Sequence, residues 1–92
     1  MILYAEVECL LYEGNSLKDK RSILKRLFAK LKNEYNVAVA ELDYQNLWQR
    51  TKFGIVTISS DAIQAERVIQ QVLRQIDQIP ELERTITTFE KV

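Results

Sequence analysis

The sequence contains no histidine, and among its 92 residues it has only one cysteine, one proline and two glycines. Without histidine, the commonest general base and metal ligand is missing. A single cysteine, Cys9, excludes an internal disulfide and argues against zinc and other transition-metal sites. No Walker loop, dinucleotide-binding glycine pattern or nucleophile elbow is present. We therefore expect a protein that is not an enzyme and that holds no cofactor or metal.

Long apolar runs are also missing. No segment approaches the roughly 20 residues that cross a bilayer, and no signal peptide precedes the first expected strand. Low glycine and proline content and balanced charges, 13 basic and 13 acidic residues, are typical of a globular protein. Cys9 lies in an alternating strand pattern, which indicates a buried thiol. We expect a single cytoplasmic domain over residues 1–92, with no membrane attachment.

The charges balance only over the whole chain. Residues 18–32 hold seven cations against one acid, Asp19, while the rest of the chain holds six cations and twelve acids. The seven cations are Lys18, Lys20, Arg21, Lys25, Arg26, Lys30 and Lys32. This segregation indicates a locally basic surface.

Hydrophobic periodicity divides the chain into six elements. Alternation predicts strands over 2–12, 37–43, 53–60 and 83–91. Helical spacing predicts one helix over 17–34, capped by Ser16, and a second that begins after Asp61 and ends before Pro80. The order β-α-β-β-α-β in so short a chain predicts a ferredoxin-like α+β domain, a split βαβ sandwich. Right-handed crossovers give an antiparallel sheet with strand order 4-1-3-2 and both helices on one face.

This topology brings distant segments together. The loop before the basic helix and the connection over 44–52 should lie at the same end of the sheet, together with the loop around Pro80. The start of the basic helix and the connection that holds Trp48 are therefore expected to be neighbours.

Two motifs carry a resemblance to a known family. Ser16-Leu17-Lys18-Asp19-Lys20-Arg21-Ser22, and Leu47-Trp48-Gln49-Arg50 after Asp43, resemble the signatures of the YlxP-like family of small bacterial proteins. The resemblance runs essentially end to end and implies a ferredoxin-like, cytoplasmic bacterial protein. The family is a domain of unknown function whose genes commonly lie among translation genes, which suggests a role with RNA or the ribosome.

The basic helix is the first candidate binding surface. Projected at 100° per residue, Lys18, Arg21, Lys25 and Lys32 form a row along one flank of the apolar stripe. Such a row would suit a phosphate backbone, and equally an acidic protein partner. It would also suit a solvated face that keeps a small protein soluble.

Lys20 projects into the apolar arc of the same helix and should point toward the sheet. It also lies in the first helical turn, where the helix dipole disfavours a cation. A carboxylate is expected to compensate it, and Asp43 is the candidate. Lys20 then either pins the helix to the connection through an ion pair or contacts a ligand.

Trp48 is the only tryptophan, and it lies in a connection that is long for a hairpin. We expect Leu47 and Trp48 to fold back against the end of the core. Alternatively, Trp48 is the aromatic of a basic patch that Arg50 and Lys52 share with the basic helix. Aromatics beside arginines suit looped RNA and also suit protein interfaces.

The face of the sheet opposite the helices is the last candidate. RNA-recognition motifs have this strand order and display aromatics on strands 1 and 3, where this chain has Tyr4 and Phe53. We expect both on the open face, together with Leu10, Val37, Val39 and Ile55. A face this apolar also suits pairing with a second copy of the chain.

An enzymatic alternative comes from the acylphosphatases, which share the fold and bind phosphate in the first strand–helix loop. Here that loop reads Glu13-Gly14-Asn15-Ser16, with an acid and without an arginine. The sequence therefore favours a non-enzymatic binding module, with RNA or a ribosomal particle as the expected partner. The alternative is a protein-interaction or homodimerising module whose basic helix docks an acidic partner.

Overall fold

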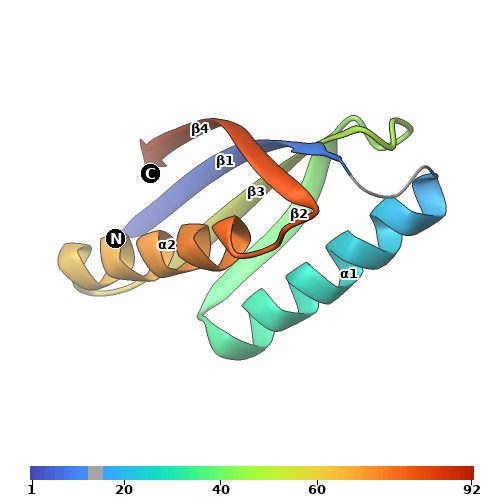
Figure 1. Ribbon diagram of the computed structural model, residues 1–92. Helices are drawn as coiled ribbons and strands as arrows, with labels where there is room; N and C mark the ends of the chain where they lie inside the picture. The colour runs from blue at the N-terminus through green and yellow to red at the C-terminus, as the bar shows by residue number, and fades with distance from the viewer. Residues whose placement is uncertain (13–15) are drawn as a thin grey trace.

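The chain forms six elements in the order β-α-β-β-α-β, as Figure 1 shows for the computed structural model. The structure describes residues 1–12 and 16–92, so the 13–15 part of the loop discussed above lies outside the described residues. The elements are β1 (Ile2–Leu11), α1 (Leu17–Glu34), β2 (Val37–Asp43), β3 (Arg50–Ile58), α2 (Ala62–Asp77) and β4 (Leu82–Lys91).

The four strands form one antiparallel sheet in the order β2-β3-β1-β4, which is the predicted order read from the other edge. Both helices lie on the same face of this sheet (Figure 1). The ferredoxin-like α+β fold is therefore confirmed. β2 and β4 are the two edge strands, and among residues 1–12 and 16–92 no other element covers the face opposite the helices.

The core lies between the sheet and the two helices. Every second residue of β1, from Leu3 to Leu11, is buried, as the alternation predicts. Phe53 of β3 is fully buried and meets Phe28 of α1 edge-on, with 5.3 Å between ring centroids. Replacing such a ring by alanine costs about 3–5 kcal/mol, so this contact is a principal attachment of α1 to the sheet.

The helices begin where capping residues allow. Ser16 Oγ accepts a hydrogen bond from the backbone N–H of Asp19 at 3.1 Å, and Asp61 Oδ1 accepts one from Ile63 at 2.9 Å. Each bond satisfies an amide that has no partner within its own helix. α2 ends at Asp77, before Pro80, as expected.

The connection between β2 and β3 is shorter than predicted. β3 begins at Arg50 rather than at residue 53, because its pairing with β1 continues through Thr51 opposite Cys9 and Arg50 opposite Leu10. The connection therefore comprises residues 44–49, and Arg50 and Lys52 are strand residues instead of turn residues.

The predicted position of Phe53 on the open face is wrong. Phe53 and Ile55 are fully buried on the helix face, and Val39 is 8% exposed there. Because successive side chains of a strand alternate, the open face of β3 carries the residues between them. These residues are Arg50, Lys52, Gly54, Val56 and Ile58. Phe53 thus packs the core and is no stacking platform.

Candidate nucleic-acid interface

Lys20 fastens the start of α1 to the connection between β2 and β3. Its side chain is 1% exposed, and its Nζ donates to the carbonyl oxygens of Tyr44 at 2.6 Å and Leu47 at 2.7 Å. The same Nζ lies 2.9 Å from Glu41 Oε2. The predicted proximity of these two segments is confirmed, and Lys20 serves as a buried anchor rather than an exposed contact residue.

The carboxylate that compensates Lys20 is Glu41, so the prediction of Asp43 is wrong. Glu41 lies opposite Phe53 in the sheet and therefore faces the helices. An irregularity between Glu41 and Asp43 breaks the alternation of β2 there. Asp43 Oδ1 instead accepts the backbone N–H of Tyr44 at 2.7 Å, and Thr51 Oγ1 donates to Glu41 Oε2 at 2.6 Å.

Tyr44 begins the connection in an unusual backbone conformation, with a φ of 62°. A residue other than glycine rarely adopts this left-handed region, and doing so costs about 1–3 kcal/mol. The Lys20 bond to the Tyr44 carbonyl helps to hold this conformation. The Arg50 guanidinium lies over the Tyr44 ring, 4.3 Å from its centroid, and helps to fix the side chain.

Trp48 is half-buried, beside Leu47, whose carbonyl oxygen Lys20 binds. The expectation that the Leu47 side chain packs on the core is wrong, because it is 50% exposed. The connection is thus held next to the start of α1 through its backbone, while the Trp48 side chain stays partly exposed.

Six exposed cations of α1 make up what we call the α1 basic face, of which Arg26 and Lys30 occupy the flank toward the loop after α2, where they border a hollow with Gln78 and Glu81. None of them makes an ion pair within the part of the chain that the structure describes. They are Lys18, Arg21, Lys25, Arg26, Lys30 and Lys32. The buried side of α1 holds Lys20 with the apolar stripe, so these charges point away from the sheet. Lys18, Arg21 and Lys25 were predicted as binding residues from their projection, and the structure places all three on this face.

Arg50 and Lys52 do not belong to the α1 basic face. Both lie on the open face of the sheet, where Arg50 Nη2 is 3.1 Å from Glu8 Oε1 and Lys52 Nζ is 2.8 Å from Glu6 Oε1. The hydrogen bond from Lys52 lowers the pKa of Glu6, and the same contact raises the pKa of Lys52. A patch that joins these two residues to Lys18 and Arg21 was predicted, but their strand positions turn them away from the helices.

Sequence reasoning missed several residues of this region. Arg26 and Lys30 were counted among the seven cations but left out of the binding set, although their charge was the available signal. Glu41 was missed too. The alternation of Val37, Val39 and Glu41 was the signal that could have placed it on the helix face.

Tyr4 lies on the open face as predicted and covers Gly54. Its hydroxyl donates to Glu6 Oε2 at 2.8 Å, and burial together with this bond raises the pKa of Tyr4. A Cβ on residue 54 would meet Tyr4 Cε1 at 2.9 Å, so a glycine is needed for the ring to lie flat on the sheet. Beside the ring, a shallow hollow extends over β2 and β3, lined by Ala38, Leu42 and Val56.

Three further properties of the described residues bear on the function. Across 1–12 and 16–92, no group of three histidine, cysteine, aspartate or glutamate side chains is arranged to hold a metal ion. No helix in this same portion is long and apolar enough to cross a membrane. Burial raises the pKa of the Cys9 thiol to about 12, which makes it a poor nucleophile at neutral pH.

Comparison with known proteins gives a family but no activity. A family model described as "Protein of unknown function (DUF503)" matches residues 2–89. The chain is 50% identical over 90 residues to the uncharacterized protein YlxP of Bacillus subtilis (strain 168), covering 98% of both chains.

Solved structures share the fold at low identity. A structural-genomics protein, YJCS, matches with a TM-score of 0.65 and 10% identity, covering 100% of this chain and 99% of that one. SnoaB, a cofactor-independent oxygenase from Streptomyces nogalater, matches with a TM-score of 0.64 and 12% identity, covering 99% of this chain and 92% of the other. At such identities the likeness extends to the fold alone.

Proposed function

The chain belongs to the DUF503 family of proteins of unknown function, and from this premise we propose that it is a non-enzymatic module that binds RNA or a ribosomal particle through the α1 basic face. The observation that carries the proposal is a contrast between two sets of cations. Those of the α1 basic face have no ion pair among the described residues. Most of the other cations are paired with carboxylates, namely Lys20, Arg50, Lys52, Arg84 and Lys91.

The spacing of these charges suits a phosphate backbone. Lys18, Arg21 and Lys25 recur every three or four residues, which is about 5–6 Å along a helix. Cations that meet phosphates release condensed counterions, and this release supplies most of the sequence-independent affinity for nucleic acid. Lysines and arginines already paired within the protein would gain less, because they would first lose their carboxylate partners.

The α1 basic face lacks an exposed apolar centre, and this favours RNA over an acidic protein as its partner. Among the described residues, no large apolar side chain that is strongly exposed belongs to α1. Protein interfaces have an apolar, desolvated centre surrounded by polar groups, whereas contacts to phosphate need only cations and polar groups. The α1 surface has the second composition.

Trp48 extends the proposed surface beyond charge. It lies at the N-terminal end of α1, in a connection that Lys20 holds in place. An aromatic ring next to a basic surface offers a stacking platform for an unpaired base, and such stacking contributes about 1–3 kcal/mol per base. We therefore propose looped or single-stranded RNA as the preferred form.

The test is the binding of a labelled RNA hairpin, followed by fluorescence anisotropy at several salt concentrations. Reversing two charges, in Lys18→Glu/Arg21→Glu, should abolish binding, while Trp48→Ala should weaken it at every salt concentration. The matched control is Arg67→Glu/Arg74→Glu, which reverses two exposed cations of α2 and should weaken binding far less. Equal losses in both double variants, or no binding by the wild type at low salt, would contradict the proposal.

The free thiol supports the proposed setting and the proposed absence of catalysis. Cys9 is buried and free, as expected for a protein that works in the reducing cytoplasm. With a pKa of about 12 it does not supply a thiolate nucleophile.

A second candidate function is association of two copies through the open face. Two hollows on this face share Ala38 and Val56, and beside them Leu42 is 45% and Ile58 is 61% exposed. Arg50 and Lys52 of β3 are already paired on this face with Glu8 and Glu6 of β1, so stacking two copies leaves these four charges balanced. Four strands about 4.8 Å apart give a face of roughly 500 Å² in projection. The accessible surface of such a face is larger than its projection, because side chains stand up from it. A standard interface takes about 800 Å² of accessible surface per partner, so a stable pair of copies would use the whole face.

Light scattering over a range of concentrations tests this candidate. Ile58→Lys should shift the protein to a monomer, because it places a charge on the stacked faces, in a hollow that Ile58 lines together with Ala38 and Val56. Ile63→Lys is the matched control, because Ile63 is 66% exposed but lies on α2. A wild type that stays monomeric at high concentration would exclude this association.

A further inference from the structure

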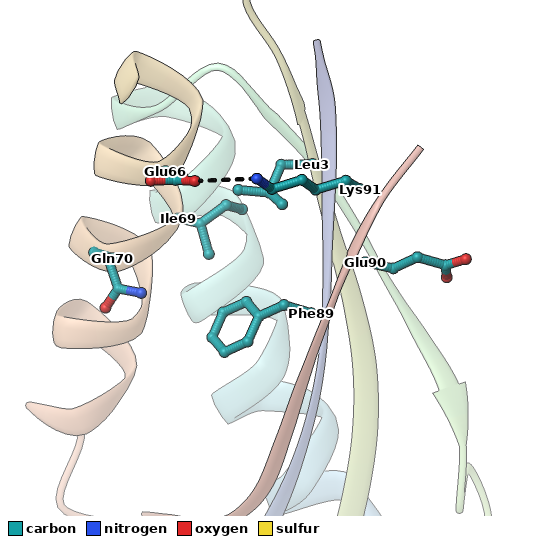
Figure 2. Close-up of a pocket in the computed structure, with 7 residues that line it drawn as sticks. All are labelled: Leu3, Glu66, Ile69, Gln70, Phe89, Glu90 and Lys91. Carbon is teal, nitrogen blue, oxygen red and sulfur yellow. Dashed lines mark ion pairs between the residues drawn. The ribbon is translucent and has the colours of Figure 1, made fainter. Parts of the chain in front are cut away.

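A pocket of about 330 Å³ lies between α2 and the C-terminal part of β4, away from α1 and from the centre of the open face (Figure 2). The pocket exists because β4 is an edge strand. On the helix side only α2 lies next to β4, so the space between them stays open at the edge of the sheet. Its size is at the lower end for pockets that hold small molecules.

The inner surface of this pocket is apolar. Leu3 of β1 and Ile69 of α2 form the floor and are 5% and 0% exposed. Phe89 of β4 points toward α2 and forms one wall, yet its ring is 52% exposed (Figure 2). Covering such a half-exposed aromatic ring with an apolar group removes apolar surface from water, which is favourable in free energy.

The rim carries two opposite charges side by side. Lys91 Nζ lies 3.7 Å from Glu66 Oε1, which is longer than a hydrogen bond, and the two side chains are 66% and 55% exposed. An exposed pair at this distance contributes little stability, so each group can take a different partner at low cost. Figure 2 shows both charged groups above Leu3 and Ile69, whereas Glu90 points away from α2.

We propose that this pocket binds an apolar α-amino acid as its zwitterion. An α-amino acid carries an ammonium and a carboxylate on the same carbon, which is the reverse of the pair on the rim. Placed antiparallel to that pair, its carboxylate meets Lys91, its ammonium meets Glu66, and its side chain enters the space between Ile69 and Phe89. An internal peptide residue lacks the two charges, and a charged or very small side chain lacks the apolar group.

This inference is separate from the proposed RNA binding, since none of the pocket residues lies on α1. A failure of one leaves the other intact. The amino acid would bind weakly, because the pocket is open on one side and its charges are already partly satisfied by each other.

Titration of leucine into the ¹⁵N-labelled protein, followed by amide chemical shifts, tests the proposal. Saturable shifts are expected at Ile69, Phe89 and their neighbours. Three probes separate the contributions: glycine lacks the apolar side chain, 4-methylpentanoate lacks the ammonium, and isoamylamine lacks the carboxylate. Each should bind about tenfold more weakly than leucine, the loss expected for one charge-assisted contact or one apolar side chain.

Variants of the rim complete the test. Glu66→Gln and Lys91→Gln should each weaken leucine binding about tenfold without unfolding the protein, because both side chains are exposed. Glu90→Gln is the matched control, a neighbouring carboxylate that points elsewhere, and should leave the affinity unchanged. Equal binding of leucine and isoamylamine, equal effects of Glu66→Gln and Glu90→Gln, or no saturable shifts at millimolar leucine would each overturn the proposal. Shifts of the same amides that depend only on protein concentration would assign the pocket to a second copy and overturn it as well.

Discussion

Replacing Lys20 by methionine should destabilise the protein more than replacing any other lysine. Methionine fills most of the buried volume but leaves the carbonyl oxygens of Tyr44 and Leu47 without their donor and Glu41 without its cation. Breaking a buried ion pair from one side costs about 3–5 kcal/mol. Glu41 is still 19% exposed, so water compensates part of the loss, and we expect about 3 kcal/mol.

Urea denaturation and thermal melting measure this loss directly. For a domain of this size, 1 kcal/mol shifts the melting temperature by about 4–8 °C, so a loss of 3 kcal/mol lowers it by roughly 12–24 °C. Trp48 lies in the connection that Lys20 holds. Acrylamide should therefore quench the fluorescence of Trp48 more strongly in Lys20→Met than in the wild type, even under conditions where the variant is folded.

Two variants sharpen the test. Lys25→Met removes an exposed cation from the same helix and should change stability by less than about 0.5 kcal/mol. Lys20→Met/Glu41→Gln should recover part of the loss, because it removes the orphaned charge. A Lys20→Met protein that melts at the wild-type temperature would refute the pinning role.

Three further outcomes follow from the packing and the charges. Gly54→Ala should lower stability by about 1–3 kcal/mol, because the new Cβ displaces the Tyr4 ring, whose hydroxyl is bonded to Glu6; a variant as stable as the wild type in urea denaturation would mean that the ring moves aside without loss. The two hydrogen bonds from Arg84 lower the pKa of Asp77 in the folded state, so this carboxylate stabilises the protein above the ordinary aspartate pKa of about 3.9 and loses its effect as the pH falls through the folded-state pKa. Asp77→Asn should therefore lower the free energy of unfolding, measured with urea, by less than about 1 kcal/mol near neutral pH and match the wild type in strong acid, and a difference that persists in acid would contradict the argument. Cys9, with a thiol pKa of about 12 and 1% exposure, should react with iodoacetamide only through unfolding, so alkylation that is rapid in the native protein and independent of urea would refute its burial.

The sequence was sufficient for the architecture because each element carries its own periodicity. The alternation of β1, the apolar stripe of α1 and the caps at Ser16 and Asp61 all agree with the structure. The burial of Lys20 could also be predicted, since its projection falls within the apolar arc of α1.

The predictions for Phe53 and for the partner of Lys20 were wrong because periodicity does not show which face of the sheet a strand residue occupies. Apolar residues occupy both faces of β3, so alternation alone did not decide whether Phe53 or Gly54 faces the helices. Pairing with β1 decides it, and that register is a long-range property. The partner of Lys20 was mistaken for a related reason, because the irregularity of β2 between Glu41 and Asp43 has no signature in the sequence.

The most direct test of the α1 basic face is to count the ions that it releases on binding RNA. A plot of log K against log salt concentration has a negative slope. Removing one α1 cation that contacts a phosphate, as in Lys25→Gln, should reduce the magnitude of this slope by about 0.7. Lys52→Gln, which removes a cation already paired with Glu6, should leave the slope unchanged. Equal slopes for the wild type and Lys25→Gln, or a fall for Lys52→Gln as large as that for Lys25→Gln, would contradict the proposal that α1 binds RNA.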